Sequence, residues 1–378
     1  MRRDDEVTVA ARVAAVLRPA LEGVAAYEPG RPIDDVRREL GIDSVVKLAS
    51  NEGPHPPMPA AIQAIRDAAE GIRVYPDPGA WALRDALSAA TGVPSAGILA
   101  GAGIDGLIPL VCGAVLDPGD ELAMGWPSFM SWRQQAVLRG AVVKTAPLRA
   151  DGGYDLDALL AQVGPRTKLV VVVSPNNPTG QAVARGELEA FLDALPGHVL
   201  PVLDEAYFEY LGPDDHDGAA MVAAGRPLVV TRTFSKAYGL AGLRVGYLFA
   251  PAEFVTALGK VRSVFDVSAT AQAAAVASLA DAPAHLPERV GLILQQRDLV
   301  AEGLRALGFD PLPSRANFLT FDTSSPEQAA ALNQDLLSGG VIVRPLGAFG
   351  APASIRVTVG WPAENERFLA TLEQVSAG

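Results

Sequence analysis

Cysteine and histidine are scarce in this chain, and their scarcity excludes two classes of site. Cys112 is the only cysteine among 378 residues, so an intrachain disulfide is impossible and a reducing compartment is expected. The four histidines include no pair with the spacing of metal ligands, which argues against a structural or catalytic zinc site.

Long apolar runs and strongly basic segments are also missing. No apolar run reaches the roughly 18 residues that would span a bilayer. The first residues carry charges of both signs and lack the apolar core of a signal peptide. A formal net charge of -12 argues against nucleic-acid binding. We therefore expect a cytoplasmic protein that binds neither a membrane nor a nucleic acid.

Hydrophobic residues make up 49% of the chain, which is enough for one large domain and a smaller one. Short apolar segments alternate with helical patterns over the first two thirds. Strands are expected at residues 121–124, 142–144, 168–173, 198–203, 228–230 and 245–249. Helices are expected at residues 7–17, 59–70, 83–90, 155–162 and 187–194. This alternation is typical of an α/β fold with a mostly parallel sheet.

The pattern changes near residue 265. Two helices are expected at residues 269–279 and 287–307, followed by strands at 318–321, 341–343 and 355–359 and by helices at 326–337 and 364–375. We therefore divide the chain into an N-terminal arm (residues 1–45), a large domain (46–265) and a small C-terminal domain (266–378).

Lys236 follows an expected strand and is surrounded by hydroxyls and small residues, with Arg244 shortly after it. A lysine attacks an aldehyde only after it loses its proton, and its ordinary pKa is about 10.4. Burial and a neighbouring cation lower that pKa, which is how a Schiff-base lysine is activated. Taken alone, the segment favours a simpler interpretation, in which Ser235 caps a helix and Lys236 lies in its first turn.

Two upstream segments strengthen the case for a ligand site. The strand at 168–173 leads into Ser174-Pro175-Asn176-Asn177-Pro178-Thr179-Gly180, and the strand at 198–203 leads into Asp204-Glu205-Ala206-Tyr207. The carboxyl ends of parallel strands meet at one edge of a sheet, and ligands bind at that edge.

Further segments continue this pattern in chain order. They are Lys47 to Glu52, Tyr75 to Asp77, Ala316 to Phe318, Val343 to Pro345 and Ile355 to Gly360. Together with the segments above, they make the chain resemble the fold type I pyridoxal-phosphate (PLP) aminotransferases, in particular the histidinol-phosphate aminotransferase group. The resemblance implies a large domain with a mostly parallel sheet flanked by helices, a smaller α+β domain, and PLP as the cofactor.

The resemblance also assigns catalytic roles. Lys236 would bind the cofactor aldehyde and then act as general base and acid. Asp204 would pair with the pyridine nitrogen and keep it protonated, while Asn177 and Tyr207 would hydrogen-bond the phenolic oxygen. The cofactor phosphate would be held by the backbone N–H groups of Ile104 and Asp105 at a helix N-terminus and by the side chains of Thr233, Ser235 and Arg244.

Other implied roles concern the ring and the substrate. Phe129 would stack on the pyridine ring, where the family usually has a tyrosine, and Tyr75 would reach in from the partner subunit of a homodimer. The implied substrate-binding residues are Arg356, Arg344, Tyr27 and Asn317. A guanidinium suits a carboxylate or phosphate because it donates two parallel hydrogen bonds.

These roles predict a two-stage, ping-pong transfer of an amino group. The group resemblance favours L-histidinol phosphate as donor and 2-oxoglutarate as acceptor, a reaction of histidine biosynthesis. An aromatic amino-acid aminotransferase and a threonine-phosphate decarboxylase are the alternatives within related scaffolds. Substrate choice stays open because Gly53-Pro54-His55-Pro56 replaces the group's usual Asn-Pro-Leu-Gly and because Phe129 lacks the usual hydroxyl.

Two functions of other classes were weighed. Residues 101–106 spell G-x-G-x-x-G, and acids at 120 and 121 follow at about the distance of a ribose-binding acid, as in nicotinamide dehydrogenases. That motif should open a nucleotide-binding half, which nothing downstream completes. A PLP-binding transcription regulator needs an added helix-turn-helix domain, for which the acidic N-terminal region leaves no room.

Overall fold

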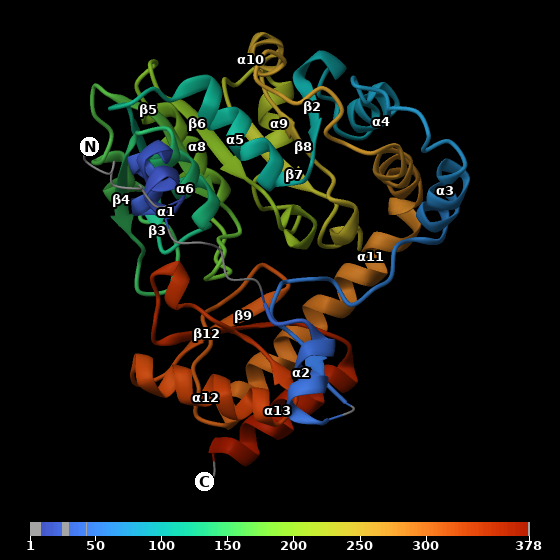
Figure 1. Ribbon diagram of the computed structural model, residues 1–378, viewed down its shortest axis with the longest axis vertical. Helices are drawn as coiled ribbons and strands as arrows, with labels where there is room; N and C mark the ends of the chain where they lie inside the picture. Colours follow the sequence, from blue (N-terminus) through green and yellow to red (C-terminus); the bar gives the residue numbers. More distant parts are fainter. Residues whose placement is uncertain (1–8, 25–29, 43, 377–378) are drawn as a thin grey trace, which may run out of the picture.

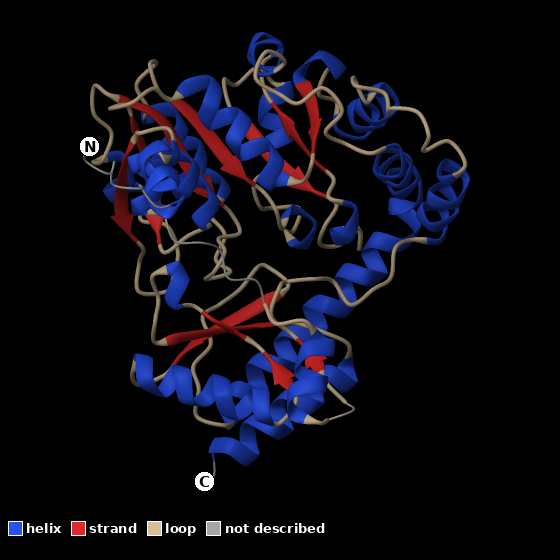
Figure 2. Ribbon diagram, viewed as in Figure 1, coloured by secondary structure: helices blue, strands red, loops and turns tan. Residues whose placement is uncertain are grey.

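Seven strands form the large sheet of the computed structural model, which describes residues 9–24, 30–42 and 44–376. Their order is β2-β8-β7-β6-β5-β3-β4, and β3 to β7 run parallel, whereas β8 is antiparallel to both of its neighbours. The strands are β2 (Ile98–Gly101), β3 (Glu121–Trp126), β4 (Val142–Pro147), β5 (Thr167–Val173), β6 (Leu200–Asp204), β7 (Val229–Thr233) and β8 (Gly246–Phe249). The predicted α/β fold class is confirmed (Figures 1 and 2).

Helices cover both faces of this sheet. In chain order, the α-helices of the described residues, those beside the small sheet included, are α1 (Val9–Val16), α2 (Ile33–Leu40), α3 (Pro59–Ala69), α4 (Trp81–Thr91), α5 (Ile104–Val115), α6 (Met130–Leu138), α7 (Leu156–Leu160), α8 (Arg185–Ala194), α9 (Gly218–Ala223), α10 (Ala252–Leu258), α11 (Ala269–Ala306), α12 (Pro326–Ser338) and α13 (Pro362–Ser376). In the described ranges, none of them is long and apolar enough to cross a bilayer.

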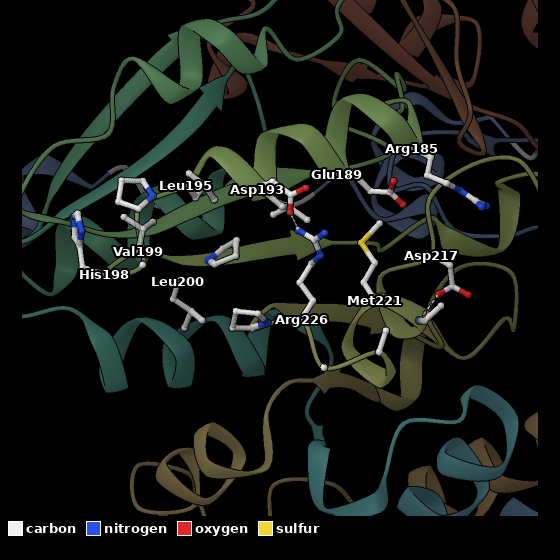
Figure 3. A pocket seen from close by; sticks show the side chains of 18 residues that line it. Arg185, Glu189, Asp193, Leu195, His198, Val199, Leu200, Asp217, Met221 and Arg226 are labelled. Carbon is white, nitrogen blue, oxygen red and sulfur yellow. Dashed lines mark hydrogen bonds and ion pairs between the residues drawn. The ribbon is translucent and has the colours of Figure 1, made fainter.

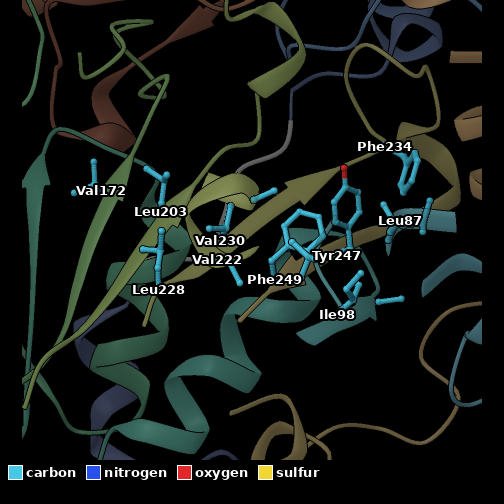
Figure 4. Close-up of a cluster of buried hydrophobic side chains, with 14 of the residues drawn as sticks. Leu87, Ile98, Val172, Leu203, Val222, Leu228, Val230, Phe234, Tyr247 and Phe249 are labelled. Carbon is cyan, nitrogen blue, oxygen red and sulfur yellow. The ribbon is translucent and has the colours of Figure 1, made fainter. Parts of the chain in front are cut away.

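The valine run of β5 explains how the sheet is buried. Val170 and Val172 belong to one hydrophobic cluster, with residues of α4, α8, α9 and α11. Val171 and Val173 belong to a second cluster, with residues of α5, α6 and α10. Successive strand residues point to opposite faces, so a strand covered on both sides must be apolar throughout. Figure 4 shows the first cluster, in which Val172, Leu203, Val230, Tyr247 and Phe249 lie together along the sheet.

A second, smaller sheet lies below the first in Figure 1. It is antiparallel, in the order β11 (Arg344–Pro345), β12 (Ser354–Thr358) and β9 (Phe318–Asp322). Beside it, β1 (Val46–Lys47) pairs in parallel with β10 (Val341–Ile342), which joins an N-terminal segment to the C-terminal part of the chain. The proposed domain boundaries at residues 45 and 265 stay a prediction.

One expectation about the helices was wrong. Both expected segments fall in a single helix of 38 residues, α11, which ends at Ala306 and contains Pro283 and Pro287. An internal proline costs about 3 kcal/mol, because it removes a hydrogen bond and crowds the preceding turn. Packing at both ends offsets this cost: Ala271, Ala274 and Ala275 belong to the core of the large sheet, and residues 300, 301 and 304 to the core of the small sheet.

The burial of the large sheet on both faces predicts how a core substitution changes stability. Leu248 is fully buried in β8, and Leu248→Ala removes its methyl groups from the second cluster. The free energy of unfolding is expected to fall by about 2 to 5 kcal/mol, measured by urea denaturation. Leu299→Ala is the matched control, because Leu299 is 49% exposed on α11. An equal loss in the two variants would contradict the assignment of Leu248 to the core.

Candidate active site

A cavity of about 570 Å³ lies at the carboxyl ends of β5, β6 and β7. It collects eleven of the predicted site residues: Ile104, Asp105, Phe129, Asn177, Asp204, Tyr207, Thr233, Ser235, Lys236, Arg244 and Arg356. Arg356 comes from β12 of the small sheet, so both sheets contribute to the walls. The cavity lies at the strand ends where the sequence predicts a ligand site.

Asp204 ends β6 and is 1% exposed. Its Oδ2 accepts a hydrogen bond from Trp132 Nε1 at 2.9 Å, and its Oδ1 accepts one from the backbone N–H of Ala206 at 3.2 Å. Burial raises the pKa of Asp204 to about 6, because a charged carboxylate loses solvation, while the two donors act in the opposite direction. A cation beside this carboxylate would be strongly favoured.

Lys236 follows β7 and reaches the same cavity. Its Nζ donates to the backbone carbonyl of Ser50 at 3.3 Å and lies 5.7 Å from the ring centre of Tyr207. Burial, and after it the positive charge of Arg356, lowers its pKa to about 8. Arg244, the cation expected from the sequence, contributes less to this shift than Arg356. The amine is therefore much closer to deprotonation at neutral pH than an exposed lysine.

Asn51 links the catalytic end of the cavity to the small sheet. Its Nδ2 donates to the Tyr207 hydroxyl at 2.8 Å, and its backbone N–H donates to Thr358 Oγ1 at 2.9 Å. Its φ of 54° lies in the left-handed region, which asparagine adopts more readily than most residues. Asn317 supports it from behind, because Asn317 Nδ2 donates to the Asn51 carbonyl at 3.1 Å.

Arg356 is 4% exposed and is held by groups from two segments. Its Nη1 donates to Asn177 Oδ1, and its Nη2 donates to the Ala49 carbonyl at 2.9 Å. The guanidinium also lies 5.6 Å from the ring centre of Phe349, another residue of the cavity wall. The two predicted side chains Arg356 and Asn177 are therefore in direct contact.

The opposite end of the cavity has the features of an anion site. Helix α5 begins at Ile104, directly after Gly103, and helix N-termini attract anions. Thr233 Oγ1 donates to Ser235 Oγ at 2.8 Å. Gly103 has a φ of 73°, which favours glycine, and a Cβ atom there would lie 2.8 Å from Arg244 Nη2. Arg244 Nη2 lies 3.7 Å from Asp105 Oδ2, and its side chain is half exposed.

Three of the predicted residues that the structure describes do not line the cavity. Tyr75 is 79% exposed and stacks on Phe265 with ring centres 4.5 Å apart. Arg344 is buried on β11, where it pairs in register with Arg356. Asn317 is fully buried and reaches the site only through Asn51. Tyr27 lies outside the described residues.

Several wall residues were not predicted. Phe349, Ser131 and Gln134 line the cavity, and Trp132 lies behind Asp204. Trp132 stands in α6, a helix that the sequence pattern did not reveal, so no local signal connects it to an acid 72 residues away. Asn51 belongs to the segment Lys47 to Glu52, which carries part of the family resemblance. An asparagine tolerates a positive φ, so its residue type is the available sign of the unusual backbone conformation there.

A larger cavity of about 1040 Å³ lies between α8, α9 and the starts of β6 and β7 (Figure 3). Three of its charged side chains are held in ion pairs: Arg226 Nη1 is 2.7 Å from Asp193 Oδ1, and Asp217 Oδ1 is 2.7 Å from Arg232 Nη2. No lysine occurs among its wall residues. Its chemistry is that of a solvated groove, whereas the smaller cavity holds the perturbed acid and amine.

Known proteins are similar to this chain in sequence and in fold. A histidinol-phosphate aminotransferase of Anaeromyxobacter sp. (strain Fw109-5) is 41% identical over 358 residues, which cover 94% of this chain and 98% of that protein. An aromatic amino acid aminotransferase of Nocardia farcinica is 43% identical over 364 residues, covering 94% of this chain and 96% of that protein.

A solved structure gives the same result. The histidinol-phosphate aminotransferase of Sinorhizobium meliloti in complex with pyridoxal-5'-phosphate superposes with a TM-score of 0.88 at 31% identity, covering 96% of this chain and 98% of the other. The family model for aminotransferase class I and II matches residues 43–372. Given this match and the full-length relatives, the chain belongs to the class I and II aminotransferases.

Proposed function

We propose that this aminotransferase uses PLP to transfer the amino group of L-histidinol phosphate to 2-oxoglutarate, a step of histidine biosynthesis. The observation that carries the proposal is the convergence of Lys236 and Asp204 on one cavity that also contains an anion site. The named function of full-length relatives at about 40% identity supports the substrate.

The cavity fits PLP at three separate points. Asp204 offers a buried carboxylate for a protonated ring nitrogen, and Lys236 offers an amine with a lowered pKa for the aldehyde. Thr233, Ser235, Arg244 and the N-terminus of α5 offer donors for the phosphate, beside a glycine that leaves no Cβ in the way. When bound, PLP would draw electrons from the substrate Cα and carry the amino group between the two half-reactions.

The side chains of the chain itself then have defined tasks. Lys236 Nζ, once free, removes the proton from the substrate Cα, a role that suits a pKa near the working pH. Tyr207 and Asn177 face the same cavity and would donate hydrogen bonds to the ring oxygen. Asp204, in its ionised form, would hold the ring nitrogen of PLP in its protonated form. Phe129, at the start of α6, would pack against the ring face.

Arg356 is the proposed anchor for the acidic end of each substrate. Its guanidinium lines the cavity and suits a carboxylate or phosphate. Arg344, the neighbouring residue across β11 and β12, is proposed to assist from outside the cavity wall. We also propose that Tyr27 covers the substrate, and this role rests on the family resemblance alone.

An aromatic amino-acid donor is the second candidate. The Nocardia farcinica relative, named an aromatic amino acid aminotransferase, is 43% identical to this chain. In addition, Phe129, Met130 and Phe349 give the cavity an apolar wall that would accept an aromatic ring.

A homodimer with shared active sites would explain the position of Tyr75. Its ring is 79% exposed, and the exposed apolar residues of this region include Ile72, Val74, Trp81, Val264 and Phe265. Large exposed apolar groups of this kind mark interaction surfaces. We propose that a second copy covers them and that Tyr75 reaches the partner's cofactor phosphate.

Replacement of Lys236 tests the assignment of the catalytic base. Lys236→Ala is expected to lower turnover by at least about 10²- to 10⁴-fold, because no other lysine lines the cavity. Circular dichroism should show an unchanged fold. Lys260→Ala, at an exposed position outside the cavity, is the control and should retain full activity. Near-normal turnover of Lys236→Ala would exclude the proposed mechanism.

The pH dependence of cofactor uptake tests the environment of Lys236. Only the uncharged amine attacks an aldehyde, and burial beside Arg356 lowers its pKa to about 8. The rate at which cofactor-free protein takes up PLP is therefore expected to rise about fivefold from pH 7 to pH 8 and to level off above about pH 9. Stopped-flow absorbance measures this rate. A midpoint near the ordinary lysine value would show that the amine is not desolvated.

A donor panel distinguishes the two substrate candidates. Histidinol phosphate, phenylalanine, tyrosine, aspartate and threonine phosphate are each added to the PLP-loaded enzyme, and the change in visible absorption of the cofactor is followed. Histidinol phosphate is expected to react most rapidly. A rapid reaction with phenylalanine and none with histidinol phosphate would establish the aromatic alternative instead.

A further inference from the structure

Trp132 donates a hydrogen bond to Asp204 from the first turn of α6. The distance from Nε1 to Oδ2 is 2.9 Å, the indole is fully buried, and the carboxylate is 1% exposed. The backbone N–H of Ala206 donates to the other oxygen, Oδ1, at 3.2 Å. Each carboxylate oxygen therefore accepts a hydrogen bond, and the Thr231 hydroxyl of β7 also acts to lower the pKa of Asp204.

The chemistry of the indole determines which protonation state of Asp204 this hydrogen bond favours. A tryptophan N–H donates and never accepts, so it bonds only to an oxygen with a free lone pair. The bond is stronger to a carboxylate than to a carboxylic acid, and it therefore favours the ionised form. No water can replace it, because neither partner is accessible.

Other groups near Asp204 act against ionisation. Burial is the largest effect, and the negative charge of Asp105, at the start of α5, adds to it. The hydroxyl of Tyr154 is also close enough to feel the carboxylate, but it is uncharged because burial raises its own pKa to about 12. Lys236, which follows β7 in the chain, lines the same cavity, and its positive charge would favour the ionised acid. Without a donor at Oδ2, the buried acid would be harder to keep charged.

We propose that Trp132 is a positioning residue of the transamination site, whose indole N–H keeps Asp204 ionised and oriented for the protonated ring nitrogen of the cofactor. This inference rests on the proposed function. The Trp132 side chain would then have two roles. Its ring packs in the second hydrophobic cluster, and its nitrogen bonds Asp204 in the active site.

The contact itself is tested in the unmodified full-length protein without added cofactor. The chain has four tryptophans, so the ¹H–¹⁵N spectrum of the indole groups contains few signals. The Trp132 signal is assigned by elimination with Trp81→Phe, Trp126→Phe and Trp361→Phe. It is expected to shift with a midpoint near pH 6, as Asp204 takes up its proton. An indole signal that stays constant while Asp204 takes up its proton, followed by the ¹³C signals of labelled aspartate, would overturn the proposal.

A variant separates positioning from packing. Trp132→Phe keeps an aromatic ring in the cluster but removes the donor. The pKa of Asp204, followed by ¹³C signals of labelled aspartate and assigned with Asp204→Asn, is expected to rise by roughly 1 to 2 pH units. With bound PLP, the acid limb of kcat/KM is expected to move upward in the same direction.

Trp126→Phe is the matched control. Trp126 is a half-buried tryptophan at the end of β3 that contacts Arg133 at 5.3 Å, and it does not bond Asp204. This variant should leave the Asp204 titration unchanged. A purely structural role for Trp132 predicts lower stability with no change in that titration. If wild-type protein binds no PLP, the proposed function fails, whereas the NMR titration still tests the contact between Trp132 and Asp204.

Discussion

The removal of Asp204 and Lys236 from water is the constraint on which the site depends. Low polarity disfavours charge on both groups, so it raises the pKa of the acid to about 6 and lowers that of the amine to about 8. The same burial therefore moves the pKa values of an acid and of an amine toward neutral pH, the first from below and the second from above. Their position at the carboxyl ends of β6 and β7 is what makes a common burial possible.

The second sheet completes this environment. Arg356 of β12 contacts Asn177 after β5, and Asn51 bonds both Tyr207 and Thr358. The segment that carries Asn51 is anchored by the pairing of β1 with β10 and by the bond from Asn51 to Thr358 of β12. The cavity is consequently built by segments that are far apart in the chain, and its polar groups are oriented by contacts across the junction of the two sheets.

The sequence predicted those parts of the site that follow strands with a strong apolar pattern. Asp204, Asn177 and Thr233 stand where buried strands end, and Lys236 follows shortly after, so one edge of the sheet collected them. Trp132 was missed because its role depends on a contact across 72 residues, for which its own helix gives no sign. Tyr75 was assigned to a partner subunit, and a single chain leaves it exposed. The prediction of two separate helices in place of α11 was wrong because tertiary packing outweighs the local effect of the two prolines.

Helix α11 has a mechanical consequence. One end is embedded in the core of the large sheet and the other in the core of the small sheet, so the helix behaves as a strut between them (Figure 1). Pro283 and Pro287 are one turn apart, and neither supplies an N–H to the helix ladder. The strut is therefore least stiff over that single turn. Any rotation of one sheet relative to the other would be concentrated there, and it would change the separation between Arg356 and Lys236.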